Sequence, residues 1–315
     1  MTGYIIRRLG QSIIVTLGVL FIMFVLQSLL PNPARAILGV KATRAQINAF
    51  IQQNDLNKPF YVQFAHYVVN VVWHHDLGQA YQLNQSVASI IARDAPKSLV
   101  LVGVALAIAI IIAVPIGVYQ AVKRNTVGDQ AVTAVSFLLY SLPTFFLGQI
   151  LILAFAEALH WFPSEAPQGP TLGQILADPI ALVLPIANLV LVNYAGYSRF
   201  MRSSAIEALA QDFIRTARAK GLPERIVLFR HMLRNALIPV VTLIGLSIPA
   251  IFTAGLITED LFNYPGIGSD YVQALVSQDY PLALGITLLV ALLTVLGNLI
   301  ADILYAVLDP RVRYR

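Results

Sequence analysis

Long apolar stretches alternate with short polar ones along most of this chain. Six windows lack Asp, Glu, Lys and Arg, and each is long enough, at about 1.5 Å per helical residue, to cross a hydrocarbon core of roughly 30 Å. They are Gln11–Leu30, Ser98–Val122, Gln130–Ala156, Pro179–Ser198, Ala236–Thr258 and Tyr280–Ala301. Only helices or closed barrels satisfy backbone groups in lipid, and these runs lack the alternation of barrel strands. The pattern therefore predicts an all-α, polytopic membrane protein with about six transmembrane helices in a single domain spanning residues 1–315.

The composition agrees with the apolar pattern. Hydrophobic residues make up 57% of the chain and charged residues 12%, against roughly 25% charged residues in soluble domains. A secretory signal is an alternative for the first window, because Arg7 and Arg8 precede it. The apolar run is longer than the 7–15 residues of a signal core, so a retained helix is the better interpretation.

Lys and Arg gather on one side of the predicted bundle, which sets its orientation. The basic loops are those with Arg7 and Arg8, with Lys123 and Arg124, with eight cations in 199–235, and with Arg311, Arg313 and Arg315. The loops 157–178 and 259–279 contain no Lys or Arg. The connection 31–97 has six, but it is too long for the charge rule to hold. Both termini and the loop 199–235 are thus predicted to be cytoplasmic, and 31–97 and 259–279 extracytoplasmic.

No catalytic or metal site is predicted. The chain has no cysteine, which excludes disulfides, thiol nucleophiles and zinc–thiolate sites. No G-x-x-x-x-G-K-[ST], H-E-x-x-H or G-x-S-x-G motif occurs, and His74-His75-Asp76 lacks a further spaced pair of ligands. The apolar windows hold no ionisable group of the kind that an ion-coupled carrier needs. The net charge of +5 lies in inner loops beside anionic lipid, and no nucleic-acid motif accompanies it.

The basic loop 199–235 is predicted to form two helices around a tight corner. Over Ser204–Lys220 the apolar residues fall three or four apart, in one stripe. Gly221 is a helix stop, since glycine enters the left-handed region without a Cβ penalty. Pro223 suits the first turn of a second helix, Pro223–Asn235. From the residues alone, this pair is either a protruding knob that binds another protein or an amphipathic pair lying on the inner leaflet.

Polar groups beside a proline kink indicate where a pathway could run through the bundle. The cluster Tyr140-Ser141-Leu142-Pro143 is the best example. The predicted pathway residues are Tyr140, Ser141, Pro143, Asn193, Tyr194 and Thr253. For any one of them, packing is the alternative role.

The centre of the basic loop resembles a known family. The run Asp212-Phe213-Ile214-Arg215-Thr216-Ala217-Arg218-Ala219-Lys220-Gly221-Leu222, followed by His231-Met232-Leu233-Arg234-Asn235-Ala236-Leu237-Ile238-Pro239, resembles the EAA coupling loop of ABC-importer permeases. Arg215-Thr216-Ala217 stands where the general motif has Glu-Ala-Ala, as in the peptide and nickel permeases. Four dispersed segments, in the right order, also resemble that family: Tyr4–Leu9, Ser141–Phe145, Phe262–Gly268 and Asp309–Arg313.

The resemblance implies a type I ABC importer permease, a multi-pass subunit of the plasma (inner) membrane of a prokaryote, without an ATPase site of its own. It implies four kinds of partner: a second homologous permease, two ATPase subunits (or one with two nucleotide sites) that bind ATP and Mg, an extracytoplasmic substrate-binding protein, and membrane lipid. The coupling residues that it implies are Asp212, Arg215, Thr216, Ala217, Arg218, Ala219, Lys220 and Gly221. Dipeptides or oligopeptides are the expected cargo, with nickel chelates or haem as alternatives. A secondary transporter or a non-transporting scaffold is less favoured.

Overall fold

The computed structural model describes residues 2–308, and their side chains except at 2–6, 9, 244, 246–254 and 301–308. Its helices, three of them π-helical turns labelled η, are α1 (Thr2–Leu29), α2 (Ala34–Leu38), α3 (Arg44–Gln53), α4 (Phe60–Val69), η1 (Asn70–His74), α5 (Val87–Val122), α6 (Val127–Ser141), α7 (Thr144–Leu151), η2 (Ile152–Ala158), α8 (Leu172–Leu176), α9 (Val183–Leu209), α10 (Asp212–Ala219), α11 (Glu224–Ile226), η3 (Val227–Met232), α12 (Leu233–Leu261), α13 (Ile267–Val276) and α14 (Tyr280–Leu308). Over these residues the fold is all-α. An isolated bridge between Gln79 and Ser86 is the sole β contact there.

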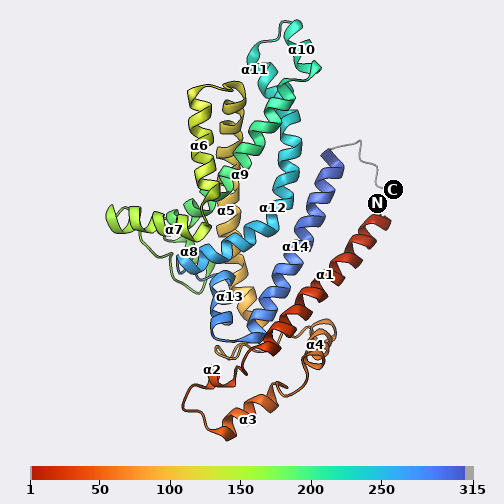
Figure 1. The fold of residues 1–315 in the computed structure, drawn as a ribbon, viewed down its shortest axis with the longest axis vertical. Helices are drawn as coiled ribbons and strands as arrows, with labels where there is room; N and C mark the ends of the chain where they lie inside the picture. Colours follow the sequence, from red (N-terminus) through yellow and green to blue (C-terminus); the bar gives the residue numbers. More distant parts are fainter. Residues whose placement is uncertain (1, 309–315) are drawn as a thin grey trace.

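Long helices run side by side from one end of the molecule to the other (Figure 1). Helices α10 and α11 project at one end, and α2 and α3 lie at the opposite end. We call these the α10 end and the α3 end. The six apolar windows of the sequence coincide with helix over most of their lengths.

Fewer helices than the six expected qualify as membrane spans by length and composition. Within the described residues, four do so: Gly10–Leu29, Val87–Val122, Glu224–Leu243 and Tyr280–Ile300. The bent pair α6–α7 brings the number to five if it counts as one span. Helix α9 is not among them. It begins only at Val183 and includes Asn188, Asn193 and Arg199, which make its helical stretch less apolar.

The window Gln130–Ala156 is not one straight helix, contrary to expectation. The chain bends by 108° between α6 and the helical segment Thr144–Ala158. Leu142 is extended there, with φ −80° and ψ 133°. A residue before proline is disfavoured in the helical region, so Pro143 ends α6 at Ser141 and starts α7 in a new direction.

Small side chains let α5 and α9 approach closely and form the centre of the bundle. Ala105, Ala109 and Ala113, each fully buried, recur every fourth residue of α5, and they lie in one hydrophobic cluster with Leu189 and Ala195 of α9. Alanine at this spacing brings two backbones together, which is how helices associate where lipid removes the hydrophobic driving force.

The segment 31–97, expected as a loop, is largely helical. It contains α2, α3, α4 and η1, and α5 already begins at Val87. Ser86 caps α5, with its side chain accepting a hydrogen bond from the Ser89 amide. The lack of charge at Ser98–Val122 therefore marks only the apolar part of a 36-residue helix, and the charged residues Arg93, Asp94 and Lys97 belong to its first turns.

Candidate functional site

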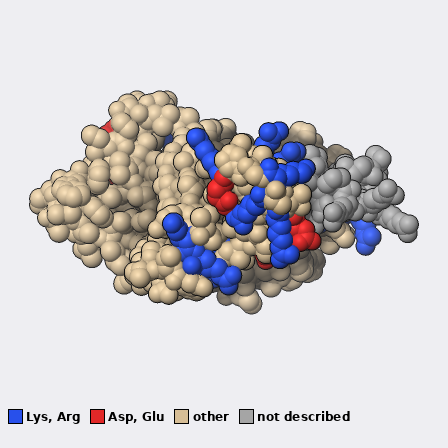
Figure 2. Space-filling view, turned by 90° about the horizontal axis from the view of Figure 1, so that it is seen from above, with Lys and Arg blue, Asp and Glu red and all other residues tan. Residues whose placement is uncertain are grey.

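The basic segment 199–235 forms the α10 end of the molecule (Figure 1). Figure 2 looks onto this end and shows many Lys and Arg side chains with few acidic ones. The exposed cations from this part of the chain are Lys123, Arg124, Arg215, Arg218, Lys220, Arg225, Arg230 and Arg234. Such a surface favours an acidic protein partner or an anionic membrane.

Helix α10 is amphipathic, and its buried side holds it on the bundle. Ile214 is completely buried and Ala217 nearly so. Both belong to a cluster that includes Met201 of α9, Val227 of η3 and Ala236 of α12. The exposed side carries Asp212 and Arg215, paired at 3.2 Å but 92% and 77% exposed. A pair so exposed stabilises little, so these groups are available to a partner.

Gly221 makes the corner that follows α10. Its φ is +72°, and its amide donates to the Arg218 carbonyl at 2.9 Å. Nothing lies within 4 Å of where a Cβ would stand. The glycine is therefore required by the backbone conformation and not by lack of space. The helix stop predicted at this residue is confirmed.

A second ion pair braces the corner. Arg218 donates to both carboxylate oxygens of Glu224, at 2.6 Å from Nη2 and 3.2 Å from Nε. Both side chains are about half exposed, so the pair contributes less than about 1 kcal/mol. It nevertheless orients Arg218 back toward α11 in the isolated chain. Of the three cations implied as contacts for an ATPase, Arg215 and Lys220 are more open than Arg218.

The predicted helix Ser204–Lys220 is wrong in one respect. Helix α9 ends at Leu209, and α10 starts at Asp212. Gln211 between them is extended, with φ −75° and ψ 153°. The break rotates the apolar stripe, so that Ile214 is buried in place of Phe213, which is 38% exposed. Two short amphipathic segments replace the single stripe.

The predicted second helix, Pro223–Asn235, continues into the membrane-spanning helix without a gap. Helix α11 starts at Glu224 after Pro223, a π-helical turn follows over Val227–Met232, and α12 begins at Leu233. A displacement of the corner at Gly221 is thereby passed directly to α12.

Arg202 and Asp129 tie the α10 end to α6. Arg202 of α9 donates to both Asp129 oxygens, at 2.8 Å from Nε and 2.7 Å from Nη2. The Asp129 side chain is only 3% or less exposed. It also accepts from the Asn125 amide at 3.0 Å and lies beside the buried side chain of Gln120. Bidentate, shielded pairs of this kind hold geometry well, so α6 and α9 are coupled at the base of the knob.

The predicted pathway residues do not meet in one cavity. Tyr140 is 60% exposed, with the Arg199 guanidinium 5.0 Å from its ring centre. Ser141 donates to the Phe137 carbonyl at 2.7 Å, and Asn193 to that of Leu189 at 2.7 Å. Tyr194 is buried in the central cluster. Pro143 lies at the α6–α7 bend, and the side chain of Thr253 lies outside the described residues. Their role in a pathway stays a prediction.

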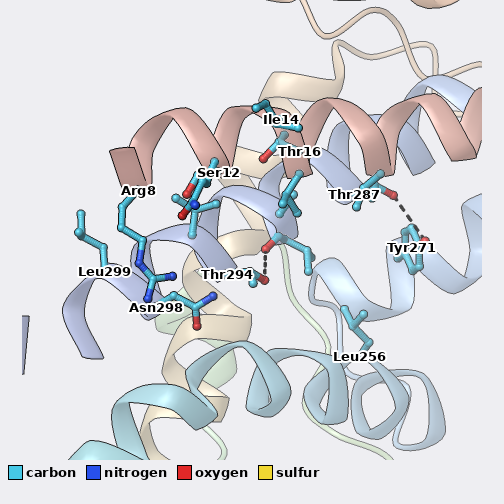
Figure 3. Close-up of a pocket in the computed structure, with 16 residues that line it drawn as sticks. Arg8, Ser12, Ile14, Thr16, Leu256, Tyr271, Thr287, Thr294, Asn298 and Leu299 are labelled. Carbon is cyan, nitrogen blue, oxygen red and sulfur yellow. Dashed lines mark hydrogen bonds between the residues drawn. The ribbon is translucent and has the colours of Figure 1, made fainter. Parts of the chain in front are cut away.

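A cavity of about 760 Å³ opens between α1, α12, α13 and α14. Figure 3 shows Arg8, Ser12 and Thr16 of α1 on one side of it and Thr287, Thr294 and Asn298 of α14 on the other. The Thr287 hydroxyl lies 3.5 Å from that of Tyr271. None of the predicted pathway residues lines it. Polar side chains along apolar helices favour helix–helix contact over contact with lipid.

Sequence reasoning missed a buried ionic cluster at the start of α5. Lys97 and Asp94 are 1% and 2% exposed, and their charged atoms lie 2.7 Å apart. Arg93 donates to the same carboxylate at 2.7 Å. The signal was Asp94 and Lys97 three residues apart, directly before the apolar run. It was assigned to a loop, where charges are ordinary.

The resembling segment Phe262–Gly268 forms a tight corner between α12 and α13. The buried Glu259 carboxylate accepts from the Gly268 amide at 2.6 Å, and the Tyr264 hydroxyl donates to the Lys97 carbonyl at 2.8 Å. A Cβ on Gly268 would stand 2.5 Å from the Leu256 Cα and 2.8 Å from a Glu259 oxygen.

Gly268→Ala is therefore expected to force α13 away from α12, at a loss of about 1–3 kcal/mol of stability. The midpoint of thermal unfolding of the purified protein in detergent should fall by several degrees. Gly173→Ala is the matched control, because nothing lies within 4 Å of its Cβ. An equal midpoint for the two variants would contradict the close approach at Gly268.

Comparison with known proteins gives consistent matches along the whole chain. The family model described as binding-protein-dependent transport system inner membrane component matches residues 113–314, and the model of its N-terminal region matches residues 1–102. The chain is 38% identical to the oligopeptide transport system permease protein AppB of Bacillus subtilis, over the full length of both. It is 36% identical to a putative peptide transport system permease protein of Brucella abortus and 35% identical to the oligopeptide permease OppB of Haemophilus influenzae, each with full coverage of both chains.

Proposed function

We propose that this chain, which belongs to the binding-protein-dependent transport system inner membrane components, is the permease through which an ATP-driven importer takes up dipeptides or oligopeptides. Its fold is that of a type I ABC importer permease. The peptide cargo rests on relatives named as oligopeptide or peptide permeases at 35–38% identity over the full chain. Nickel chelates or haem are the second candidates, because the resembling loop occurs in nickel permeases as well.

Membership of this family implies a complex with a substrate-binding protein and an ATPase. The more specific assembly that we propose has one second, homologous permease and two ATPase subunits, or one with two nucleotide sites, which supply the ATP and Mg sites. The polar cavity between α1 and α14 supports a helical partner in the membrane. Ser12, Thr16 and Asn298 line it, and lipid chains cannot satisfy such groups.

The α10 end is the proposed contact with the ATPase. Asp212, Arg215, Thr216, Ala217, Arg218, Ala219, Lys220 and Gly221 form the coupling element in this proposal. Ile214 and Ala217 anchor it, and the exposed cations present charge to the partner. Motion of the ATPase displaces α10, and the Gly221 corner passes the displacement to α12. The bundle then alternates between outward and inward openings.

The orientation that we propose places the α10 end and both termini in the cytoplasm of a prokaryote, and the α3 end outside its inner membrane. The support is the Lys and Arg bias of the loops. Arg215 and Lys220 lie at the α10 end, whereas the loops 157–178 and 259–279 contain neither Lys nor Arg.

The test is uptake by the complete complex, with its binding protein, in proteoliposomes loaded with ATP. We expect accumulation of radiolabelled tetra-alanine, and none when ATP is omitted. Accumulation without ATP would instead indicate a secondary transporter. Absence of tetra-alanine uptake, together with ATP-driven uptake of a nickel chelate or haem, would replace the peptide assignment and leave the importer class intact.

A further inference from the structure

A polar cavity of about 340 Å³ lies at the start of α5, where this helix meets α13 and the loop around Gly169. Helix α13 is toward the α3 end of the bundle (Figure 1). The charged residues that line the cavity are Arg93, Asp94, Lys97 and Asp270. Its volume is at the lower end of the roughly 300–1,000 Å³ range of small-molecule sites.

On the α5 side of this cavity the charges are matched to one another. Lys97 donates to Asp94 at 2.7 Å and to the Gly169 carbonyl at 3.0 Å. Arg93 donates to Asp94 through Nε and Nη2. The Arg93 side chain is still 41% exposed, and a guanidinium has five N–H donors. Arg93 therefore retains donors for a further acceptor in the cavity.

On the α13 side one acceptor has no donor. The Oδ2 atom of Asp270 is buried and has no hydrogen-bond partner among the described residues. A buried carboxylate oxygen without a donor is destabilising by about 1–3 kcal/mol or more. Burial and the neighbouring Asp94 carboxylate raise the pKa of Asp270 to about 7. The missing element is a cationic donor.

The lining of the cavity restricts what this donor can be. A bare divalent ion does not fit, because Arg93 and Lys97 repel it and the described residues contain no group of three or more metal-ligating side chains. A group with a cation and an acceptor close together fits better. The cation would meet Asp270, and the acceptor would meet Arg93.

We propose that this cavity binds the amino-terminal residue of a peptide. The terminal ammonium donates to Asp270 Oδ2, and the first peptide carbonyl accepts from the Arg93 guanidinium. The remaining peptide extends out of the cavity, which holds only its first residues. This inference rests on the proposed peptide cargo and adds a subsite to it.

The test is equilibrium binding to the complete complex in lipid nanodiscs without its binding protein. The probes are radiolabelled tetra-alanine and its N-acetylated form at pH 7.5. We expect the free peptide to bind at least tenfold more tightly. Asp270→Asn should reduce that affinity at least tenfold and remove the preference, without loss of co-purification with the other subunits. Asp260→Asn, an exposed acid at the end of α12, is the matched control and should change neither value.

The pH dependence provides a second measurement that does not use a variant. Asp270 faces Asp94, Arg93 and Lys97 of α5 and lies near Glu259 of α12. Only the ionised Asp270 carboxylate attracts an ammonium. Since its pKa is about 7, the affinity for the free peptide should fall as the pH drops from 7.5 to 6. The affinity for the acetylated peptide should not.

Equal binding of the two peptides, or a preference that survives in Asp270→Asn, would overturn the subsite. Wild-type uptake of tetra-alanine separates this failure from that of the proposed function. If uptake persists, only the subsite is wrong. If uptake is absent as well, the peptide cargo itself is wrong.

Discussion

Replacing Gly221 with valine is expected to leave the permease in the membrane but to reduce ATP-driven uptake by about 5- to 30-fold. The φ of +72° at this residue lies in the left-handed region, which disfavours any residue with a Cβ by roughly 1–2 kcal/mol and a β-branched one by more. Nothing lies within 4 Å of the added Cβ. The entire effect therefore arises from the backbone, which shifts to another turn and displaces α10.

The measurement is uptake together with ATP hydrolysis in the same proteoliposomes. In Gly221→Val, hydrolysis should persist while uptake falls, which is the signature of uncoupling. Gly221→Asn is the matched control, because asparagine tolerates the left-handed region and should retain most of the uptake. Normal uptake by the valine variant would show that this corner does not transmit the motion.

Replacing Arg202 with methionine is expected to have the largest effect on folding and assembly. It leaves the Asp129 carboxylate, which is 2% exposed, without its bidentate partner. Removing one member of a buried pair is destabilising by about 3–5 kcal/mol, whereas replacing both members by apolar residues is often close to neutral. We therefore expect the double variant, with Asp129→Leu, to recover much of the lost stability.

The thermal unfolding midpoint and the amount of assembled complex measure this effect. Arg124→Met is the matched control, since Arg124 is exposed in the nearby α5–α6 loop, and it should change neither. If the double variant were as unstable as the two single changes together, the pair would not be an isolated interaction. If the recovered double variant also transported normally, the pair would stabilise the fold without taking part in coupling.

The membrane class and the coupling corner could be predicted because their causes are local. An apolar window of more than 20 residues has few alternatives to a helix in lipid. Gly221 after a basic last turn, with Pro223 beyond it, indicates a stop and a restart whatever the surroundings. Family resemblance then added the partner, which no local pattern could name.

The breaks were harder to predict. Pro143 and Gln211 interrupt segments whose apolar spacing suits a single helix. Whether proline kinks a helix or ends it depends on whether neighbours satisfy the freed carbonyl groups. Whether α9 continues into α10 depends on which side chain, Phe213 or Ile214, finds a place in the bundle.

The predicted pathway residues show the same dependence on packing. Asn193 and Ser141 looked like cavity-lining groups, but each satisfies its side chain on the carbonyl four residues earlier. A polar residue in a helix has this choice, and spacing alone does not decide it.

The sequence by itself determined the helical membrane fold, the basic end and the glycine corner, because hydrophobicity, charge and backbone conformation are properties of short segments. The tertiary structure alone decided which charges meet. Asp129 and Arg202 are 73 residues apart in the chain, and Asp270 reaches the Arg93–Lys97 cluster only because α13 folds back onto α5. The stability and reactivity of buried charges depend on partners and solvent access, and these exist only after the helices have packed.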